Sequence, residues 1–158
     1  MAHSDDRDLI ESIRAASRTI VRELGFMRAT LAGTRLSIST VHALLALGER
    51  GTLTAAELSD ILNLEKSSVS RMVRKLIQAG EIEERASPSD ARAKLLSLTA
   101  RGEATLAGIE AYGRSQVETA LTSLPAEQRA LAAAGLRAYA SALSATRRTR
   151  LDRGAAHR

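Results

Sequence analysis

The chain has 158 residues and no cysteine, which excludes disulfide frameworks, cysteine-ligated zinc or iron–sulfur sites, thiol nucleophiles and thiol-based redox sensing. Histidine is nearly as scarce, because two of the three, His3 and His157, lie at the ends of the chain. A histidine-rich metal site or a histidine-dependent catalytic triad is therefore not expected.

Long apolar runs are also missing. No stretch approaches the roughly 18 apolar residues that a transmembrane helix needs, and the acidic N-terminus, MAHSDDRD, lacks the apolar core of a signal peptide. We expect no membrane partner and a cytoplasmic protein. The remaining composition, 44% hydrophobic and 26% charged residues, is typical of a single globular domain.

Positive charge is concentrated in two segments of the chain, which has a net charge of +5. Residues 147–158 carry five arginines against one aspartate, and we expect this segment to be a disordered basic tail. Residues 66–101 carry eight lysines and arginines against four acidic residues. The second cluster is the more informative, since it lies inside the predicted fold and indicates a polyanionic partner such as nucleic acid.

Helical periodicity dominates the chain. Apolar residues at helical spacing predict helices over residues 6–24, 39–50 and 66–79, and two long helices between Thr99 and residue 146 with a break near Pro125. Thr54 and Glu57 have the spacing of a capping box, which starts a short helix before the one at 66–79. Residues 81–85 and 94–98 alternate as strands, and the polar loop 86–93 joins them into a hairpin.

The predicted helix at 66–79 has two faces. One is an apolar stripe from Val69 to Leu76, and the other carries serines and arginines two residues out of phase with it. Hydroxyls bind phosphates, and arginine can bond both acceptors on a guanine edge. Lys66 and the free amides at the helix start would meet a phosphate. An equally weighted alternative is a solvated amphipathic helix whose arginines bind nothing.

The order of the predicted elements favours a DNA-binding helix at residues 66–79 over a solvated amphipathic helix. A short helix, a tight turn, a basic helix and a two-stranded hairpin make a winged helix-turn-helix. At the tip of the hairpin Arg92 could enter a minor groove, where the potential is most negative, and Asp90 could orient an arginine. The alternatives are a turn aspartate after Pro88 and an ordinary surface arginine. The candidate DNA-binding residues are Lys66, Ser67, Ser68, Ser70, Arg71, Arg74, Lys75, Asp90, Arg92 and Lys94.

Residues 58–102 resemble the MarR family of transcriptional regulators. The resemblance rests on LEKSSVSRMV at residues 64–73 and on DARAKLLSLT at residues 90–99, followed by Gly102. The helix motif together with the D-x-R wing and the L-T-x-x-G that follows is fairly specific, whereas either half alone would be weak. The flanking helices extend the likeness over most of the chain.

The resemblance implies a fold that is mainly α, with a small wing of two to three strands and with dimerisation helices at both ends. It implies a single domain over residues 1–146, with the winged-helix part at about 36–100 and dimerisation helices at 6–32 and 100–146. Members of the family form homodimers whose two winged parts read a pseudo-palindrome in double-stranded DNA. The resemblance gives Arg92 a minor-groove role and Asp90 an orienting role. We expect a repressor on this basis.

Regulators of this kind often release DNA when a small phenolic or lipophilic ligand binds between the dimer helices and the winged part. Arg28, Arg35 and His42 are the candidates for holding such an effector, and ordinary surface or interface roles are the favoured alternative for each. Residues 13–34 also resemble MarR-type domains fused to a GNAT-type acetyltransferase. A second domain of that kind does not fit in 158 residues, so no acetyltransferase activity is expected.

Two rival functions follow from the sequence. The chain could be a winged-helix interaction module that binds protein, which the cationic stripe argues against. It could also be an enzyme, but the sequence shows no paired carboxylates, metal-ligand set, phosphate-binding loop or triad. We therefore expect no catalytic residue, no cofactor and no metal site.

Overall fold

The computed structural model describes the backbone of residues 2–88 and 93–155 and the side chains of residues 6–88 and 93–149. Across the described residues the chain forms six helices and one three-stranded antiparallel sheet. It divides into two compact units, residues 1–114 and residues 115–158, with the boundary inside a helix. No helix of the described residues is long and apolar enough to cross a membrane.

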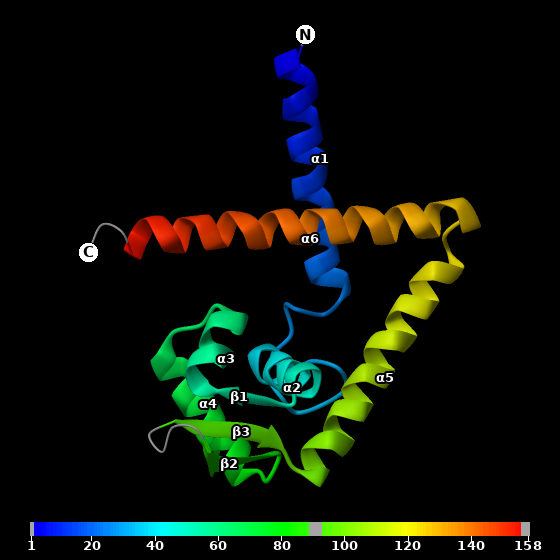
Figure 1. The fold of residues 1–158 in the computed structure, drawn as a ribbon. Coiled ribbons are helices and arrows are strands. Elements are labelled where there is room, and N and C mark those ends of the chain that lie inside the picture. The colour runs from blue at the N-terminus through cyan, green and yellow to red at the C-terminus, as the bar shows by residue number, and fades with distance from the viewer. Residues whose placement is uncertain (1, 89–92, 156–158) are drawn as a thin grey trace. The chain divides into compact units, whose positions relative to one another are not determined.

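Three helices of the first unit form the helix-turn-helix and its support: α2 (Ile38–Arg50), α3 (Ala55–Leu62) and α4 (Lys66–Gln78) (Figure 1). The predicted capping box at the start of α3 is confirmed, because Thr54 Oγ1 accepts from the Glu57 amide and the Glu57 carboxylate accepts from the Thr54 amide. The turn after α3 contains Asn63 in the left-handed conformation. The buried hydroxyl of Ser59 donates to the Leu64 carbonyl at 2.6 Å, which secures the turn before α4.

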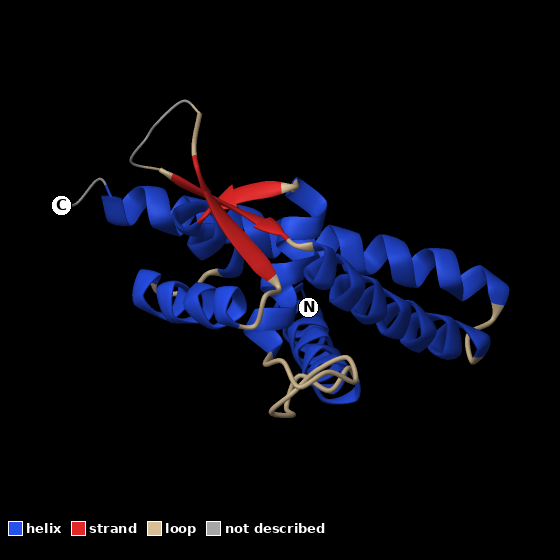
Figure 2. Ribbon diagram, turned by 90° about the horizontal axis from the view of Figure 1, so that it is seen from below, coloured by secondary structure: helices blue, strands red, loops and turns tan. Residues whose placement is uncertain are grey.

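The sheet has the strand order β1-β3-β2, formed by β1 (Thr52–Thr54), β2 (Ile82–Ala86) and β3 (Lys94–Leu98) (Figure 2). The predicted hairpin of β2 and β3 is confirmed, although β2 begins one residue later than expected because Glu81 lies in the turn after α4. The third strand lies within the predicted range of two to three. At three residues, β1 is too short to show an alternating pattern, and its pairing with β3 depends on residues more than 40 positions away.

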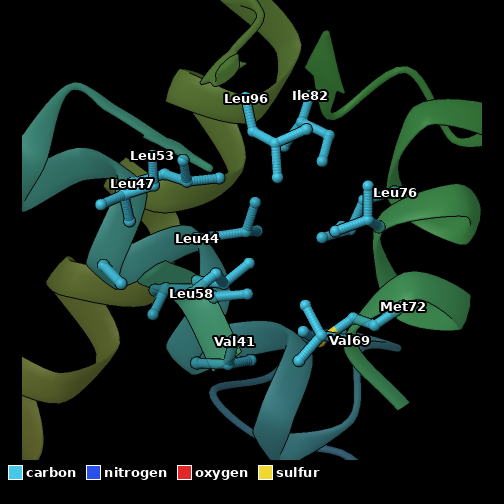
Figure 3. Close-up of a cluster of buried hydrophobic side chains, with 14 residues drawn as sticks. Val41, Leu44, Leu47, Leu53, Leu58, Val69, Met72, Leu76, Ile82 and Leu96 are labelled. Atoms are coloured by element: carbon cyan, nitrogen blue, oxygen red, sulfur yellow. The ribbon is translucent and has the colours of Figure 1, made fainter. Parts of the chain in front are cut away.

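The core of the first unit lies between these helices and the sheet. Figure 3 shows Leu44 of α2 and Leu58 of α3 facing the inner side of α4, with Leu96 of β3 and Ile82 of β2 closing the cluster. All four residues of the predicted apolar stripe of α4 are buried: Val69, Met72, Val73 and Leu76. Burying a leucine or valine of this kind contributes about 1.5–3 kcal/mol. The opposite face of α4 is therefore held outward.

Helix α5 (Ala100–Thr122) begins at the end of the sheet. The sequence predicted this helix to begin at Thr99, and Thr99 caps it, because its Oγ1 accepts from the Gly102 amide at 3.1 Å. Within the first unit, Leu106 of α5 packs on Gly48 of α2 so closely that a β-carbon at Gly48 would lie 2.3 Å from a Leu106 methyl carbon.

The N-terminal helix α1 spans Ala2–Glu23. The C-terminal end of α1 agrees with the apolar periodicity, which predicted a helix to about residue 24. The family resemblance implied a helical segment over residues 6–32, which extends too far, because residues 24–37 form turns and irregular backbone. Gly25 has a φ of +82° and ends the helix in a Schellman motif, in which Phe26 N donates to Val21 O and Gly25 N donates to Arg22 O. Large apolar side chains of α1 are exposed: Leu9, Ile10, Ile13, Ile20 and Val21.

The second unit contains the end of α5 and the helix α6 (Ala126–Ala155). Helix α6 continues past residue 146, where we expected a disordered tail to begin. Alanine, arginine and leucine, which make up much of this segment, are strong helix formers, and this accounts for the continuation. The large side chains along α6 are exposed: Leu131, Leu136, Tyr139 and Leu143.

Candidate nucleic-acid interface

The outer face of α4 carries the predicted cationic and hydroxyl-bearing residues. Because the apolar stripe is buried, the helix places Lys66, Ser67, Ser70, Arg71, Arg74 and Lys75 on the exposed side, with Ser68 beside them. We call these seven residues the outer face of α4. The structure therefore brings together seven of the ten candidate DNA-binding residues on one helix.

The cations of this face have no acidic partner among the described residues. The four ion pairs in that part of the chain lie elsewhere: Arg14–Glu11, Arg85–Glu83, Lys94–Glu84 and Arg101–Glu81. Arg71 Nη2 makes one bond, donating to Ser68 Oγ at 3.4 Å. Positive charge that is not neutralised within the protein is available to a polyanion.

The start of α4 adds backbone donors to this face. Its N-cap residue, Glu65, makes no side-chain bond to the amides of the first turn. An α-helix leaves its first amides without an intrahelical acceptor, and the helix dipole favours an anion there. The start of α4, flanked by Lys66 and Ser67, is therefore suited to a phosphate.

The wing is less basic than its lysine and arginine content implies. Lys94 Nζ lies 2.6 Å from Glu84 Oε1, and Arg85 pairs with Glu83 on the same strand. The candidate Lys94 is therefore already engaged within the hairpin. Asp90 and Arg92 lie outside the described residues.

The three effector-binding candidates, Arg28, Arg35 and His42, do not line one common cavity. His42 lines a cavity of about 610 Å³ together with Ile38 at the start of α2, Ile61 at the end of α3 and Leu64 in the turn after it. Its ring lies 5.9 Å from that of Phe26, tilted by 50°. Arg28 and Arg35 are not among the residues that line this cavity. Of the three candidates, His42 is the one that lines this cavity.

The sequence interpretation missed a group of hydroxyls beside the outer face of α4. Ser37, Ser39 and Thr40, at the start of α2, line a cleft of about 500 Å³ together with residues of α4, among them Arg71 and Arg74. The available signal was the cluster S-I-S-T at residues 37–40, which precedes an apolar helix and predicts a cap. Nothing in the local pattern indicates that this turn lies against α4.

Comparison with known proteins agrees with this geometry. The model of the MarR family matches residues 36–93. The HTH-type transcriptional regulator BilQ of Clostridium symbiosum is 27% identical over 122 residues, which cover 76% of this chain and 85% of the relative.

Two solved structures have the same fold at lower identity. FabT of Streptococcus pneumoniae in complex with DNA superposes with a TM-score of 0.71 at 22% identity, over 87% of this chain and 96% of that one. BpsR of Bordetella bronchiseptica, whose DNA binding is regulated by 6-hydroxynicotinic acid, superposes with a TM-score of 0.65 at 17% identity, over 82% and 98%. Residues 36–93 therefore match the model of the MarR family, and the chain has the winged helix-turn-helix fold of these solved structures.

Proposed function

We propose that this chain is a sequence-specific, DNA-binding transcriptional regulator and not an enzyme. The observation that carries the proposal is the outer face of α4, where four cations without acidic partners among the described residues stand beside three serines on a helix-turn-helix. In the proposed complex Arg71 and Arg74 enter a major groove and bond base edges, and Lys66 and Lys75 bind phosphates.

The test is duplex binding by the wild-type chain and by Arg71→Ala and Arg74→Ala, measured at several salt concentrations. A base-reading arginine is worth about 1–3 kcal/mol and its loss relaxes specificity at one position, whereas loss of a phosphate contact weakens all duplexes alike. Arg14→Ala on α1 is the matched control, since it removes an exposed helical arginine outside α4. Wild-type binding that is weak, without sequence preference and insensitive to both α4 variants would favour the protein-interaction module instead.

The proposed regulator is a homodimer. The exposed leucines and tyrosine of α6 and the exposed aliphatic residues of α1 are apolar surface of the kind that a second copy covers. Two copies related by a two-fold axis present two α4 helices to successive major grooves, about 10 bp apart, and so read a pseudo-palindrome. A DNA-bound relative, FabT, has the same fold.

We further propose that the regulator is a repressor and that a small ligand in the cavity beside His42 lowers its affinity for DNA. The cavity is mainly apolar, with the Phe26–His42 ring pair next to it, and BpsR is a relative in which a small aromatic acid regulates DNA binding. 6-Hydroxynicotinic acid is therefore the first probe. It should weaken duplex binding by the wild-type chain, and His42→Ala should reduce that effect.

A further inference from the structure

The cleft between α2 and α4 has two chemically different walls. One wall is the start of α2, which contributes the hydroxyls of Ser37, Ser39 and Thr40. The other wall is α4, which contributes Arg71, Arg74 and Lys75. None of the residues that line the cleft is acidic. The two walls come from helices that are separated by 15 residues of intervening chain, and both helices bury side chains in the same hydrophobic core.

The α2 wall is an ordered set of hydroxyl groups. Ser37 Oγ lies 2.8 Å from Thr40 Oγ1 and 3.1 Å from Ser39 Oγ, and it also caps the helix by accepting from the Thr40 amide. Hydroxyls that are already linked to one another lose little side-chain freedom when they bind a further acceptor. They stand at the positive end of a 13-residue helix, which favours an anion.

The α4 wall supplies the charge. Arg74 and Lys75 make no ion pair with any acidic side chain of the described residues, and Arg71 is bonded only weakly, to Ser68. The Lys75 ammonium and the three hydroxyls match the needs of a phosphodiester, whose oxygens accept from such donors, and the two arginines add positive potential beside them. Because α4 itself enters the groove in the proposed complex, a cleft along its side lies where the sugar–phosphate backbone borders that groove.

We propose that Ser37, Ser39 and Thr40 at the start of α2, together with Lys75 of α4, hold one backbone phosphate of the DNA, while Arg71 and Arg74 in the same cleft extend to the base edges. This inference rests on the proposed function and assigns a phosphate site to a helix outside the helix-turn-helix pair. The contact carries no sequence information, so its contribution is the same on every duplex. It fixes the depth and angle at which α4 enters the groove.

The test uses a substitution that separates folding from binding. Thr40→Glu in the full chain puts a carboxylate three residues after the N-cap Ser37, which is the capping-box spacing, so it stabilises the start of α2 while placing a negative charge at the cleft. Thr40→Gln has nearly the same shape and also suits a capping box, but it carries no charge. Gln128→Glu, in the first turn of α6, is the control for net charge, since it makes the same change in charge at an equivalent helix position on a residue that does not line the cleft.

With Thr40→Glu, the affinity for a selected duplex and for a random duplex should fall by the same factor, at least about tenfold, while the thermal midpoint is unchanged or raised. The slope of log K against log salt should become shallower by about one unit. Thr40→Gln and Gln128→Glu should bind within about twofold of wild type.

Equal affinities of Thr40→Glu and Thr40→Gln, with wild-type binding intact, would overturn the phosphate site and leave the regulator proposal standing. A Thr40→Glu loss confined to one duplex would also overturn it, because a backbone contact is blind to sequence. A wild-type chain without affinity for any duplex would overturn both proposals.

Discussion

Gly102 of α5 lies directly against the backbone of Glu81, such that a β-carbon at Gly102 would stand 2.0 Å from the Glu81 carbonyl oxygen. The same oxygen accepts from the Thr99 amide at 3.0 Å and from the Thr99 hydroxyl at 3.2 Å. The Glu81 carboxylate is buried and accepts from Arg101 Nε at 3.2 Å. Hydrogen bonds from Thr99 and Arg101 thus hold the turn that ends α4 against the first turn of α5, and the orientation of α4 depends on this contact.

Gly102→Ala should destabilise the first unit by about 1–3 kcal/mol, because the new methyl group meets backbone and not a side chain that can rotate away. The measurement is chemical denaturation followed by circular dichroism. Gly108→Ala is the matched control on the same helix, since a β-carbon there meets nothing within 4 Å. It should stabilise the chain by about 0.5–1 kcal/mol, and a loss of equal size in both variants would contradict the close-contact explanation.

The capping box of α3 predicts a dependence of stability on pH. The backbone amide of Thr54 and then its hydroxyl donate to the Glu57 carboxylate, at 2.7 and 2.8 Å, and they lower the pKa of Glu57 below its ordinary value of 4.5. A carboxyl whose pKa is lower in the folded chain stabilises folding above its unfolded pKa, and this contribution is lost as pH falls through the folded pKa.

Wild type should therefore be more stable than Glu57→Gln at neutral pH, and the difference should disappear as the pH is lowered below 4.5. Glutamine can keep the capping geometry but does not titrate, so this comparison isolates the charge. Denaturation curves at a series of pH values give the result. A difference that stays constant down to pH values well below 4.5 would mean that Glu57 has an unshifted pKa.

Glu84 neutralises a cation that the proposed wing would otherwise offer to DNA. Glu84→Gln should release Lys94 and remove one negative charge, so duplex affinity should rise several-fold, by roughly 1 kcal/mol, and become more sensitive to salt. Lys94→Gln should have the opposite effect. Glu11→Gln is the control, because it frees Arg14 on α1 in the same way. Equal changes in Glu84→Gln and Glu11→Gln would show a general effect of net charge and would remove the wing from the interface.

The exposed apolar residues of α6 predict self-association. The wild-type chain should sediment at twice 16.9 kDa, and Leu136→Glu should shift it toward the monomer mass because a buried carboxylate opposes association. Arg137→Glu is the control, since successive residues on a helix are about 100° apart and Arg137 lies away from the side shared by Leu136, Tyr139 and Leu143. A wild-type monomer, or equal effects of both substitutions, would contradict the dimer.

The parts of the fold that depend on local pattern could be predicted from the sequence. The apolar stripe from Val69 to Leu76, the capping box at Thr54 and the cap at Thr99 each involve residues three to seven positions apart, and all are present. The end of α1 near residue 24 also follows from the local pattern. The family resemblance placed helix as far as residue 32, although Gly25, with its positive φ, ends the helix before that.

Features that depend on tertiary packing could not be predicted. Strand β1 forms because it pairs with β3. The contact of Gly102 with Glu81 joins residues 21 positions apart. Ser37 and Arg74 line one cleft although they lie on different helices. The sequence analysis included Lys94 among the candidate DNA-binding residues because a lysine in the hairpin is positively charged. Its partner Glu84 lies ten residues earlier and is brought near by the register of the hairpin.

The central claim is that α4 reads DNA sequence from a two-fold dimer, and selection of duplexes from a random pool by the full wild-type chain tests it most directly. We expect an enriched inverted repeat with half-sites about one helical turn apart, and loss of enrichment at single positions in Arg71→Ala and Arg74→Ala. A pool that shows no enriched sequence after repeated rounds, or an enrichment that neither arginine variant alters, would contradict the claim.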